Sequence, residues 1–276
     1  MSRSSGAEVR SLRPLVRWAK ASTKRRLGRE CGENGFKMMW PVVGLSVAVG
    51  GALGAFLYYA CTVPSSQILG PALVRGPAKG RRIALTFDDG PLSPYTEQVL
   101  DILRERRVPA TFFVCGKNVE RFPEILRRIH EEGHGLGNHT YSHPFLFSCS
   151  RAQMATQIDR TQAAIEKFTG YRPGLFRPPY GIRWFGIFGL LRERGMQMVQ
   201  WSATGFDWKL GTEDIVREAL KGIQPGAVIL LHDGVGPARP ARMDRSATIE
   251  ALPAIIDAAR NAGLTFVKVQ DFLPVA

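Results

Sequence analysis

The residues of this chain that are best suited to chemistry are a pair of carboxylates and a pair of imidazoles. Asp88 and Asp89 directly follow the apolar run IALTF, and His139 and His143 are four residues apart in HTYSHP. Two adjacent carboxylates at the end of a buried strand repel each other and are costly to desolvate, so positive charge is needed nearby. Two imidazoles and one carboxylate suit zinc or a similar divalent ion and leave a position open for water. The pattern therefore predicts a metal site, although two hydrogen-bonded loop histidines would show the same spacing.

The other aspartate would be available for proton transfer, provided that it has a counter-charge of its own. It could take a proton from water held by the metal. Arg177 in FRPPYG could supply the counter-charge, with a surface ion pair as the alternative. His232 in ILLHDG could act as a protonated imidazole, the acid that a poor leaving group requires. Asp207, beside Trp208 in GFDW, could hold that imidazole charged and oriented, and Asp233 is a competing partner.

An alternation of short strands and helices begins at residue 81 and would position these side chains. The sequence predicts strands over 83–87, 110–116, 135–139, 174–178, 196–203, 227–232 and 265–269. It predicts helices over 94–107, 118–132, 150–169, 184–194, 212–222 and 246–262.

The predicted strands are mostly continuous apolar runs, which is typical of parallel strands that are buried on both faces. No glycine-rich dinucleotide fingerprint follows the first strand, which argues against a nucleotide-binding open sheet. We therefore expect an α/β fold with a barrel of seven or eight parallel strands. The candidate residues end or directly follow these strands, and in parallel barrels that rim is the active face.

The N-terminal part of the chain is predicted to cross a membrane. Residues 1–39 carry ten Lys/Arg against three Asp/Glu, and residues 40–63 carry no charge over a length that fits a bilayer. The charge bias predicts a basic cytoplasmic arm, a signal-anchor helix over 40–63, a linker over 64–80 and an extracytoplasmic catalytic domain over 81–276. The alternatives are a buried soluble helix, a cleaved signal peptide or a lipoprotein acceptor at Cys61. No nucleic acid is expected, because topology already explains the basic arm.

The four cysteines are widely spaced and form no CxxC pair, so a cysteine-based metal site is not expected. Only Cys115 and Cys149 fall in the predicted outer domain. They could form a disulfide there, or Cys115 could be a free, buried thiol at the end of a strand.

The stretches TFDDG, HTYSHP, FRPPYG, FDW and LLHDG, in this order, resemble the five motifs of the polysaccharide deacetylases. This is carbohydrate esterase family four, the chitooligosaccharide deacetylase-like domain. The similarity spans about residues 81–272, and five motifs in order are far more specific than any one of them. The resemblance implies a distorted (β/α) barrel with one divalent metal ion, zinc first and cobalt or another ion as alternatives. One position departs from the family pattern, since Thr204 stands where an acidic residue often precedes the fourth-motif aspartate.

The resemblance also implies which residues bind the metal and which one activates water. Asp89, His139 and His143 would be the metal ligands. Asp88 would be the general base, and Arg177 would orient it.

The same resemblance implies the residues that complete the site. His232 would be the general acid, paired with Asp207. The backbone N–H of Tyr180 would help to bind the oxyanion, and Leu230 and Trp208 would line the acetyl pocket.

The expected reaction is hydrolysis of the acetamide of an N-acetylglucosamine-type unit, with water activated at the metal. An outward-facing enzyme of this kind would meet N-acetylated glycans of the cell envelope or an extracellular polysaccharide. The alternatives are an O-acetyl esterase, an amidase or deformylase acting on a small or lipid-linked amide, and a non-catalytic glycan-binding domain. The non-catalytic alternative predicts the loss of at least one catalytic motif, and all five are present.

Overall fold

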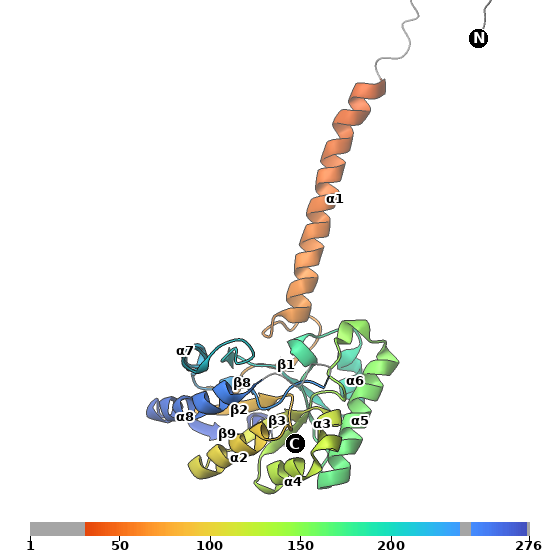
Figure 1. The fold of residues 1–276 in the computed structure, drawn as a ribbon. Coiled ribbons are helices and arrows are strands. Elements are labelled where there is room, and N and C mark those ends of the chain that lie inside the picture. The colour runs from red at the N-terminus through yellow and green to blue at the C-terminus, as the bar shows by residue number, and fades with distance from the viewer. Residues whose placement is uncertain (1–30, 238–243, 275–276) are drawn as a thin grey trace, which may run out of the picture. The chain divides into compact units, whose positions relative to one another are not determined.

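The computed structural model describes residues 31–237 and 244–274, and Figure 1 labels most of its elements along the chain. The strands are β1 (Ala72–Leu73), β2 (Arg82–Asp88), β3 (Ala110–Val114), β4 (Gly135–Asn138), β5 (Leu175–Phe176), β6 (Gln197–Val199), β7 (Ala203–Thr204), β8 (Val228–His232) and β9 (Thr265–Val267). The helices are α1 (Cys31–Thr62), α2 (Tyr95–Arg106), α3 (Gly116–Arg121), α4 (Pro123–Glu131), α5 (Arg151–Thr169), α6 (Ile187–Glu193), α7 (Thr212–Gly222) and α8 (Ser246–Asn261). Three short 3₁₀ turns complete the list, η1 (Leu146–Ser148), η2 (Pro179–Gly181) and η3 (Val269–Phe272).

The strands form one parallel sheet that curls without closing. Its order is β1-β6-β5-β4-β3-β2-β8-β7, and β9 pairs with the first residues of β2 outside this path. Every pairing in the sheet is parallel, as crossover connections through helices require. Among the described residues no pairing joins β1 to β7, so this side of the barrel stays open. The prediction of a parallel α/β fold with a distorted barrel is confirmed.

Side chains of the central strand β2 alternate between the outer and the inner face of the curled sheet. Ile83, Leu85 and Phe87 are fully buried in the largest apolar cluster, together with residues of α2, α4 and α8. Because side chains alternate along a strand, Thr86 and Asp88 must point to the opposite face, the inside of the curled sheet. Asp88 therefore reaches the interior of the barrel although it follows an apolar run.

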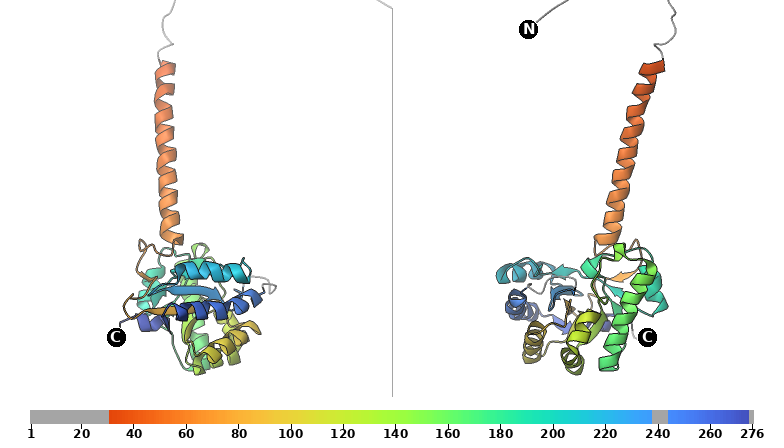
Figure 2. Two further views of the ribbon diagram at one scale, coloured as in Figure 1. Left: turned by 90° about the vertical axis from the view of Figure 1, so that its left-hand side faces the viewer. Right: turned by 45° about the vertical axis from the view of Figure 1, so that its right-hand side comes forward.

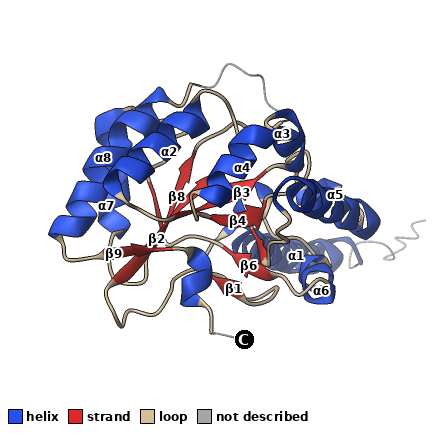
Figure 3. Ribbon diagram, turned by 90° about the horizontal axis from the view of Figure 1, so that it is seen from below, coloured by secondary structure: helices blue, strands red, loops and turns tan. Residues whose placement is uncertain are grey.

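The helices cover the outer side of the sheet. Figure 3 shows the strands in the interior, with α2, α4, α5, α7 and α8 around one side of them. The helices α7 and α8, α2 and α8, and α4 and α5 are packed neighbours, and the two views of Figure 2 show the same outer layer. Leu100 of α2, Leu126 of α4 and Ile255 of α8 are fully buried beneath this layer. Burial of each such side chain stabilises the fold by about 1.5–3 kcal/mol.

Two predicted elements are divided in the structure. The predicted helix over 118–132 is two helices, α3 and α4, which meet at Phe122. Pro123 has no N–H to continue α3 and instead begins α4. The predicted strand over 196–203 is two strands, β6 and β7, which pair with different neighbours at opposite ends of the sheet order. In both places the sequence predicts one long element where the structure has two shorter ones.

The predicted linker over 64–80 is part of the folded domain. Its residues Ala72 and Leu73 form β1, which pairs in parallel with β6. Arg183, which is 1% exposed, donates hydrogen bonds from Nη1 to the carbonyl of Ser66 at 2.5 Å and from Nη2 to that of Val63. Its backbone N–H donates to the carbonyl of Cys61 at 2.9 Å. Part of the predicted linker over 64–80 is therefore paired with, and hydrogen-bonded to, the folded domain.

The predicted membrane segment falls on α1. Residues 1–30 of the predicted basic arm lie outside the described residues, whereas the helix itself is described from Cys31. In the part of the chain that the structure describes, none of the helices has both the length and the apolar character needed to cross a bilayer. The transmembrane helix over 40–63 is therefore not confirmed.

Cys115 and Cys149 are not bridged. Cys115 is a buried free thiol that contacts the carbonyl of His139, with the sulfur 3.7 Å from the oxygen, and Cys149 is also free. The structure thus agrees with the free-thiol alternative.

Candidate active site and metal centre

Side chains from the ends of several strands meet in one cavity. Eight of the ten predicted site residues line it, namely Asp88, Asp89, His139, His143, Tyr180, Trp208, Leu230 and His232. The other two, Arg177 and Asp207, lie behind the wall and hydrogen-bond to residues that line it. Since β2, β4, β5, β7 and β8 run parallel, their carboxyl ends bring residues together that are far apart in the chain.

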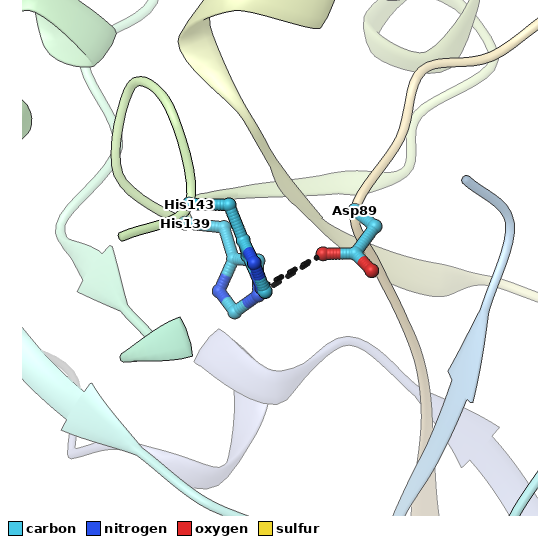
Figure 4. Close-up of side chains that lie close together, drawn as sticks. All are labelled: Asp89, His139 and His143. Atoms are coloured by element: carbon cyan, nitrogen blue, oxygen red, sulfur yellow. Dashed lines mark ion pairs between the residues drawn. The ribbon is translucent and has the colours of Figure 1, made fainter. Parts of the chain in front are cut away.

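Asp89, His139 and His143 form a compact group of three possible metal ligands. One ligand atom from each lies within 4.8 Å of the others, and all three residues are buried. Oδ1 of Asp89 lies 3.1 Å from Nε2 of His143 and 3.5 Å from Nε2 of His139. The two imidazole ring centres are 5.0 Å apart, and Figure 4 shows both rings directed at the Asp89 carboxylate. A carboxylate and two imidazoles are a donor set that zinc and similar ions prefer.

The hydrogen bonds of His139 and Asp89 fit a cation between these three residues. Nδ1 of His139 lies 2.8 Å from the carbonyl oxygen of Arg177, which can only accept, so Nδ1 carries the proton. The unprotonated Nε2 of His139 therefore points its lone pair at the Asp89 carboxylate, and Oδ1 of Asp89 is buried without a hydrogen-bond partner. Two electron-rich atoms that face each other in a buried site repel unless a cation or a proton lies between them, so the arrangement suits a bound metal ion.

The protonation of the group also suits metal binding. Burial opposes ionisation of Asp89, but His143 and His139 outweigh it and hold the pKa of Asp89 well below its usual range. Burial lowers the pKa of His143, although the neighbouring Asp89 opposes this shift. An ionised carboxylate and a neutral imidazole are the forms that bind metal ions.

Asp88 has a separate partner, the guanidinium of Arg177. Nη1 of Arg177 lies 2.6 Å from Oδ1 of Asp88, and both side chains are buried. The same Nη1 donates to Oγ1 of Thr86 at 2.8 Å, and Nη2 donates to the carbonyl of Gln200 at 3.1 Å. The guanidinium also lies 4.0 Å from the ring centre of Phe113. These contacts fix the position of Arg177 and hence the orientation of the Asp88 carboxylate.

His232 is held by Asp207. Nδ1 of His232 lies 2.8 Å from Oδ1 of Asp207, whose Oδ2 accepts from the backbone N–H of His232 at 2.7 Å and from Thr248 at 2.9 Å. Burial opposes the charged imidazole, but Asp207 outweighs it and raises the pKa of His232. Asp233, the competing partner, instead accepts from Oγ1 of Thr96 at 2.6 Å, and burial raises its pKa to about 7. The imidazole is thus oriented by Asp207, with Nε2 left for the cavity.

The loops that carry these residues are strained and closely packed. Asp89, Thr140, His143 and Tyr180 all have positive φ, which is unfavourable for residues with a side chain and recurs at functional sites. A Cβ atom on Gly236 would lie 2.7 Å from Nδ1 of His143, so only glycine lets this loop approach the imidazole. The surrounding contacts hold the site residues in place before any ligand binds.

Several residues that support the site are not indicated by the sequence pattern. Nδ2 of Asn118 donates to the carbonyls of Asp89 and Val235, at 2.7 and 3.2 Å, and so ties two loops of the site together. Trp201 and Arg245 line the cavity. Asn118 lies on a helix with no motif around it, so its position in the fold, not its spacing, gives it this contact. Of these three residues, only Trp201 could have been found from the sequence, because it lies near the end of a predicted strand.

Thr204, the departure from the family pattern, does not line the cavity. It lies in a neighbouring groove beside Phe206, and its Oγ1 accepts from the backbone N–H of Phe206 at 3.2 Å. Among the residues that line this groove, Trp201 is the one shared with the cavity.

The chain is similar to proteins of known activity. The family model for polysaccharide deacetylase matches residues 75–199. A peptidoglycan-N-acetylglucosamine deacetylase of Bacillus cereus is 38% identical over 193 residues, which cover 70% of this chain and 68% of that protein. The chain belongs to the polysaccharide deacetylase family. A chitooligosaccharide deacetylase of Bradyrhizobium sp. is 39% identical over 66% of this chain and 86% of its own length. These relatives confirm the predicted family and the predicted enzyme class, a hydrolase.

Solved structures of the family share the fold. A peptidoglycan N-acetylglucosamine deacetylase in complex with an N-hydroxybenzamide is 36% identical, with a TM-score of 0.68 over 74% of this chain and 92% of that one. A pseudoenzyme of the same family from Bacillus anthracis is 25% identical, with a TM-score of 0.66 over 73% and 68% of the two chains. The fold is thus found both with and without activity, so activity must be argued from the site residues.

Proposed function

We propose that this chain is a metal-dependent hydrolase that removes N-acetyl groups from N-acetylglucosamine units of a cell-envelope or extracellular glycan. One observation carries the proposal. A buried three-ligand group, an Arg-held carboxylate and an Asp-held imidazole surround one cavity. Hydrolysis of an unactivated amide needs these three functions, since water must be activated, negative charge stabilised and the amine protonated.

Asp89, His139 and His143 would hold the ion. When bound, a divalent ion in this position polarises the acetyl carbonyl and lowers the pKa of water. The fit rests on the lone pair of His139 that faces the buried Asp89 oxygen. Zinc is our first choice, and cobalt or another divalent ion would suit the same donors.

Asp88 would act as the general base. Its Oδ1 is held by Arg177, and its Oδ2 is directed toward the ligand group, 3.7 Å from Nε2 of His139. Asp88 would accept one proton from the attacking water as the oxygen of that water bonds to the acetyl carbon. Tyr180 lines the cavity, and its backbone N–H would donate to the oxyanion that forms.

His232 would act as the general acid. The carbon–nitrogen bond breaks as the imidazolium gives its proton to the departing nitrogen, so the products are acetate and a free amine. Asp207 keeps His232 protonated by raising its pKa. Leu230 and Trp208 line the same cavity and would enclose the methyl group of the acetyl unit.

The test is a substrate panel with the full chain and added zinc or cobalt. We expect acetate and free amine from peptidoglycan, chitin oligomers or β-linked N-acetylglucosamine polymers. Release from O-acetylated glycans alone would identify an esterase. Release from small or lipid-linked amides alone would identify an amidase or deformylase. If glycans bound without any acetate release, the chain would be a non-catalytic binding domain.

We also propose, from the sequence alone, that residues 40–63 anchor the protein in a membrane with the N-terminus in the cytoplasm and the catalytic domain outside. The proposal rests on the uncharged stretch and the basic residues before it. Fractionation of cells, followed by protease treatment of intact spheroplasts, tests it. Recovery of the full chain in the soluble fraction would disprove it.

A further inference from the structure

A row of aromatic rings leads from the wall of the cavity onto the surface. We call Tyr180, Phe145, Phe147, Trp184 and Phe185 the aromatic row. Tyr180 and Phe145 are stacked, with ring centres 4.1 Å apart and 16° between the ring planes. The following ring centres are 5.2 Å apart from Phe145 to Phe147, 6.1 Å from Phe147 to Trp184 and 5.2 Å from Trp184 to Phe185. Each ring is therefore in contact with the next.

The outer rings of the row are displayed to solvent by well-packed segments. Phe145, Phe147 and Phe185 are 44%, 50% and 54% exposed. Leu146, between the first two, is 1% exposed, and Ile187, just beyond the third, is fully buried in the same apolar cluster. The exposure is therefore not the result of loose packing. Adjoining exposed aromatic side chains on a folded domain are typical of a surface that contacts another molecule.

The row is continuous with the candidate site. Tyr180 lines the cavity, and its ring centre is 4.5 Å from that of His143, one of the three possible metal ligands. Phe145 follows His143 by two residues. The loop that carries this possible metal ligand therefore also carries the second ring of the row. A molecule that leaves the cavity past Tyr180 would next meet Phe145 and Phe147.

We propose that the aromatic row binds further sugar units of the glycan chain whose acetylated unit occupies the cavity, an inference that rests on the proposed function. The flat C–H faces of pyranose rings pack on aromatic rings. Successive rings of the row lie about one sugar ring apart. The row makes the enzyme selective for oligomers and polymers over single sugars, and it extends the binding site to one side of the reacting unit.

The charge of the row favours a neutral sugar chain over an anionic surface. Residues 144–149 and 184–188 contain no charged side chain. The guanidinium of Arg183, beside Trp184, is buried and bonded to backbone carbonyls. An anionic lipid headgroup would find no basic partner in these two segments, whereas a neutral sugar needs none.

The experiment uses the full chain loaded with zinc and compares its activity on substrates of different length. The double variant Phe147→Ala/Phe185→Ala removes two exposed rings that do not touch Tyr180. The matched control is Tyr171→Ala, an exposed aromatic residue at the opposite end of β5. We measure the ratio of kcat/KM for the N-acetylglucosamine hexamer to that for the dimer. We expect the double variant to lower this ratio about 10-fold, since the longer substrate loses two stacking contacts that the dimer does not make. Tyr171→Ala should leave the ratio at the wild-type value.

The outcomes separate this inference from the proposed function. If the wild-type enzyme deacetylates the dimer and the hexamer with equal kcat/KM, the row does not bind sugars, although the proposed function stands. If the wild-type enzyme releases acetate from neither substrate, the proposed function fails. Calorimetric titration with the hexamer then decides whether the aromatic row binds sugars. Tighter binding to the wild type than to the double variant supports the row, and equal or absent binding overturns it. An unchanged ratio with lost adsorption to phosphatidylcholine vesicles would make the row a lipid contact and overturn the proposal.

Discussion

The two adjacent aspartates should respond differently to substitution. In Asp88→Asn, the amide oxygen can still accept from Nη1 of Arg177, which lies 2.6 Å from Oδ1, so the local structure is kept. The side chain can no longer take a proton from water. A positioned general base contributes about 10²- to 10⁴-fold to the rate, so kcat/KM should fall by that factor, or about 3–5 kcal/mol in the barrier. The variant should keep its metal.

Asp89→Ala should instead lose the metal. It removes the oxygen that lies 3.1 and 3.5 Å from the two imidazoles, the sole carboxylate in the three-ligand group. Two neutral imidazoles without a carboxylate should no longer retain zinc through dialysis. The expected result is a metal content near zero together with lost activity.

Zinc content by mass spectrometry and acetate release from chitin oligomers distinguish the two effects. Asp233→Asn is the matched control, because it changes a buried carboxylate that bonds to Thr96 and not to the imidazoles. This variant should keep zinc. If Asp88→Asn lost zinc, or if it turned over as fast as the wild type, the division of roles between the two aspartates would be refuted.

Three further predictions concern charge in the fold. Asp207→Asn should lower the pKa of His232, whose protonated form is required, so the alkaline limb of the kcat/KM–pH profile should move to lower pH. An unmoved limb would exclude His232 as the acid. Burial lowers the pKa of His134 to about 4, so the folded state disfavours protonation of this imidazole. The free energy of unfolding should therefore fall by about 3 kcal/mol as the pH drops from about 6.5 to 4. In urea unfolding, His134→Gln should show a weaker pH dependence than the wild type in this window, and equal slopes would contradict the assignment. Arg177→Met should lower the free energy of unfolding by about 3–5 kcal/mol near neutral pH, because Asp88 remains buried without its partner. A loss below about 1 kcal/mol in urea would show that the pair is not needed for stability.

Those parts of the fold that depend on local pattern could be predicted from the sequence. β2, β3 and β8 are largely apolar runs, of which β2 ends in Asp88 and β8 in His232, and each lies within a few residues of its predicted range. β1 was missed because two residues, Ala72 and Leu73, are too short to show a periodicity. Their pairing with β6, more than a hundred residues later, decides their conformation.

The site was predictable where chemistry limits the residue type. Asp88, Asp89, His139 and His143 stand out because carboxylates and imidazoles are costly at the ends of buried strands. The supporting residues do not stand out in this way. Thr248 in α8 reaches Asp207 across forty-one positions of sequence, and threonine in a helix is an ordinary surface residue. Only the packing of α8 against the sheet makes it a partner of the site.

The contacts of Arg183 define where the folding unit of the catalytic domain begins. The family match starts at residue 75, but the carbonyls of Cys61, Val63 and Ser66 are partners of Arg183. A chimaera whose foreign segment before residue 67 does not form this turn would leave the donors of a buried guanidinium unmatched, at about 1–3 kcal/mol for each unmet group. The end of α1 therefore belongs to the enzyme as much as to whatever precedes it. An exchange of N-terminal segments between family members would have to carry this turn along.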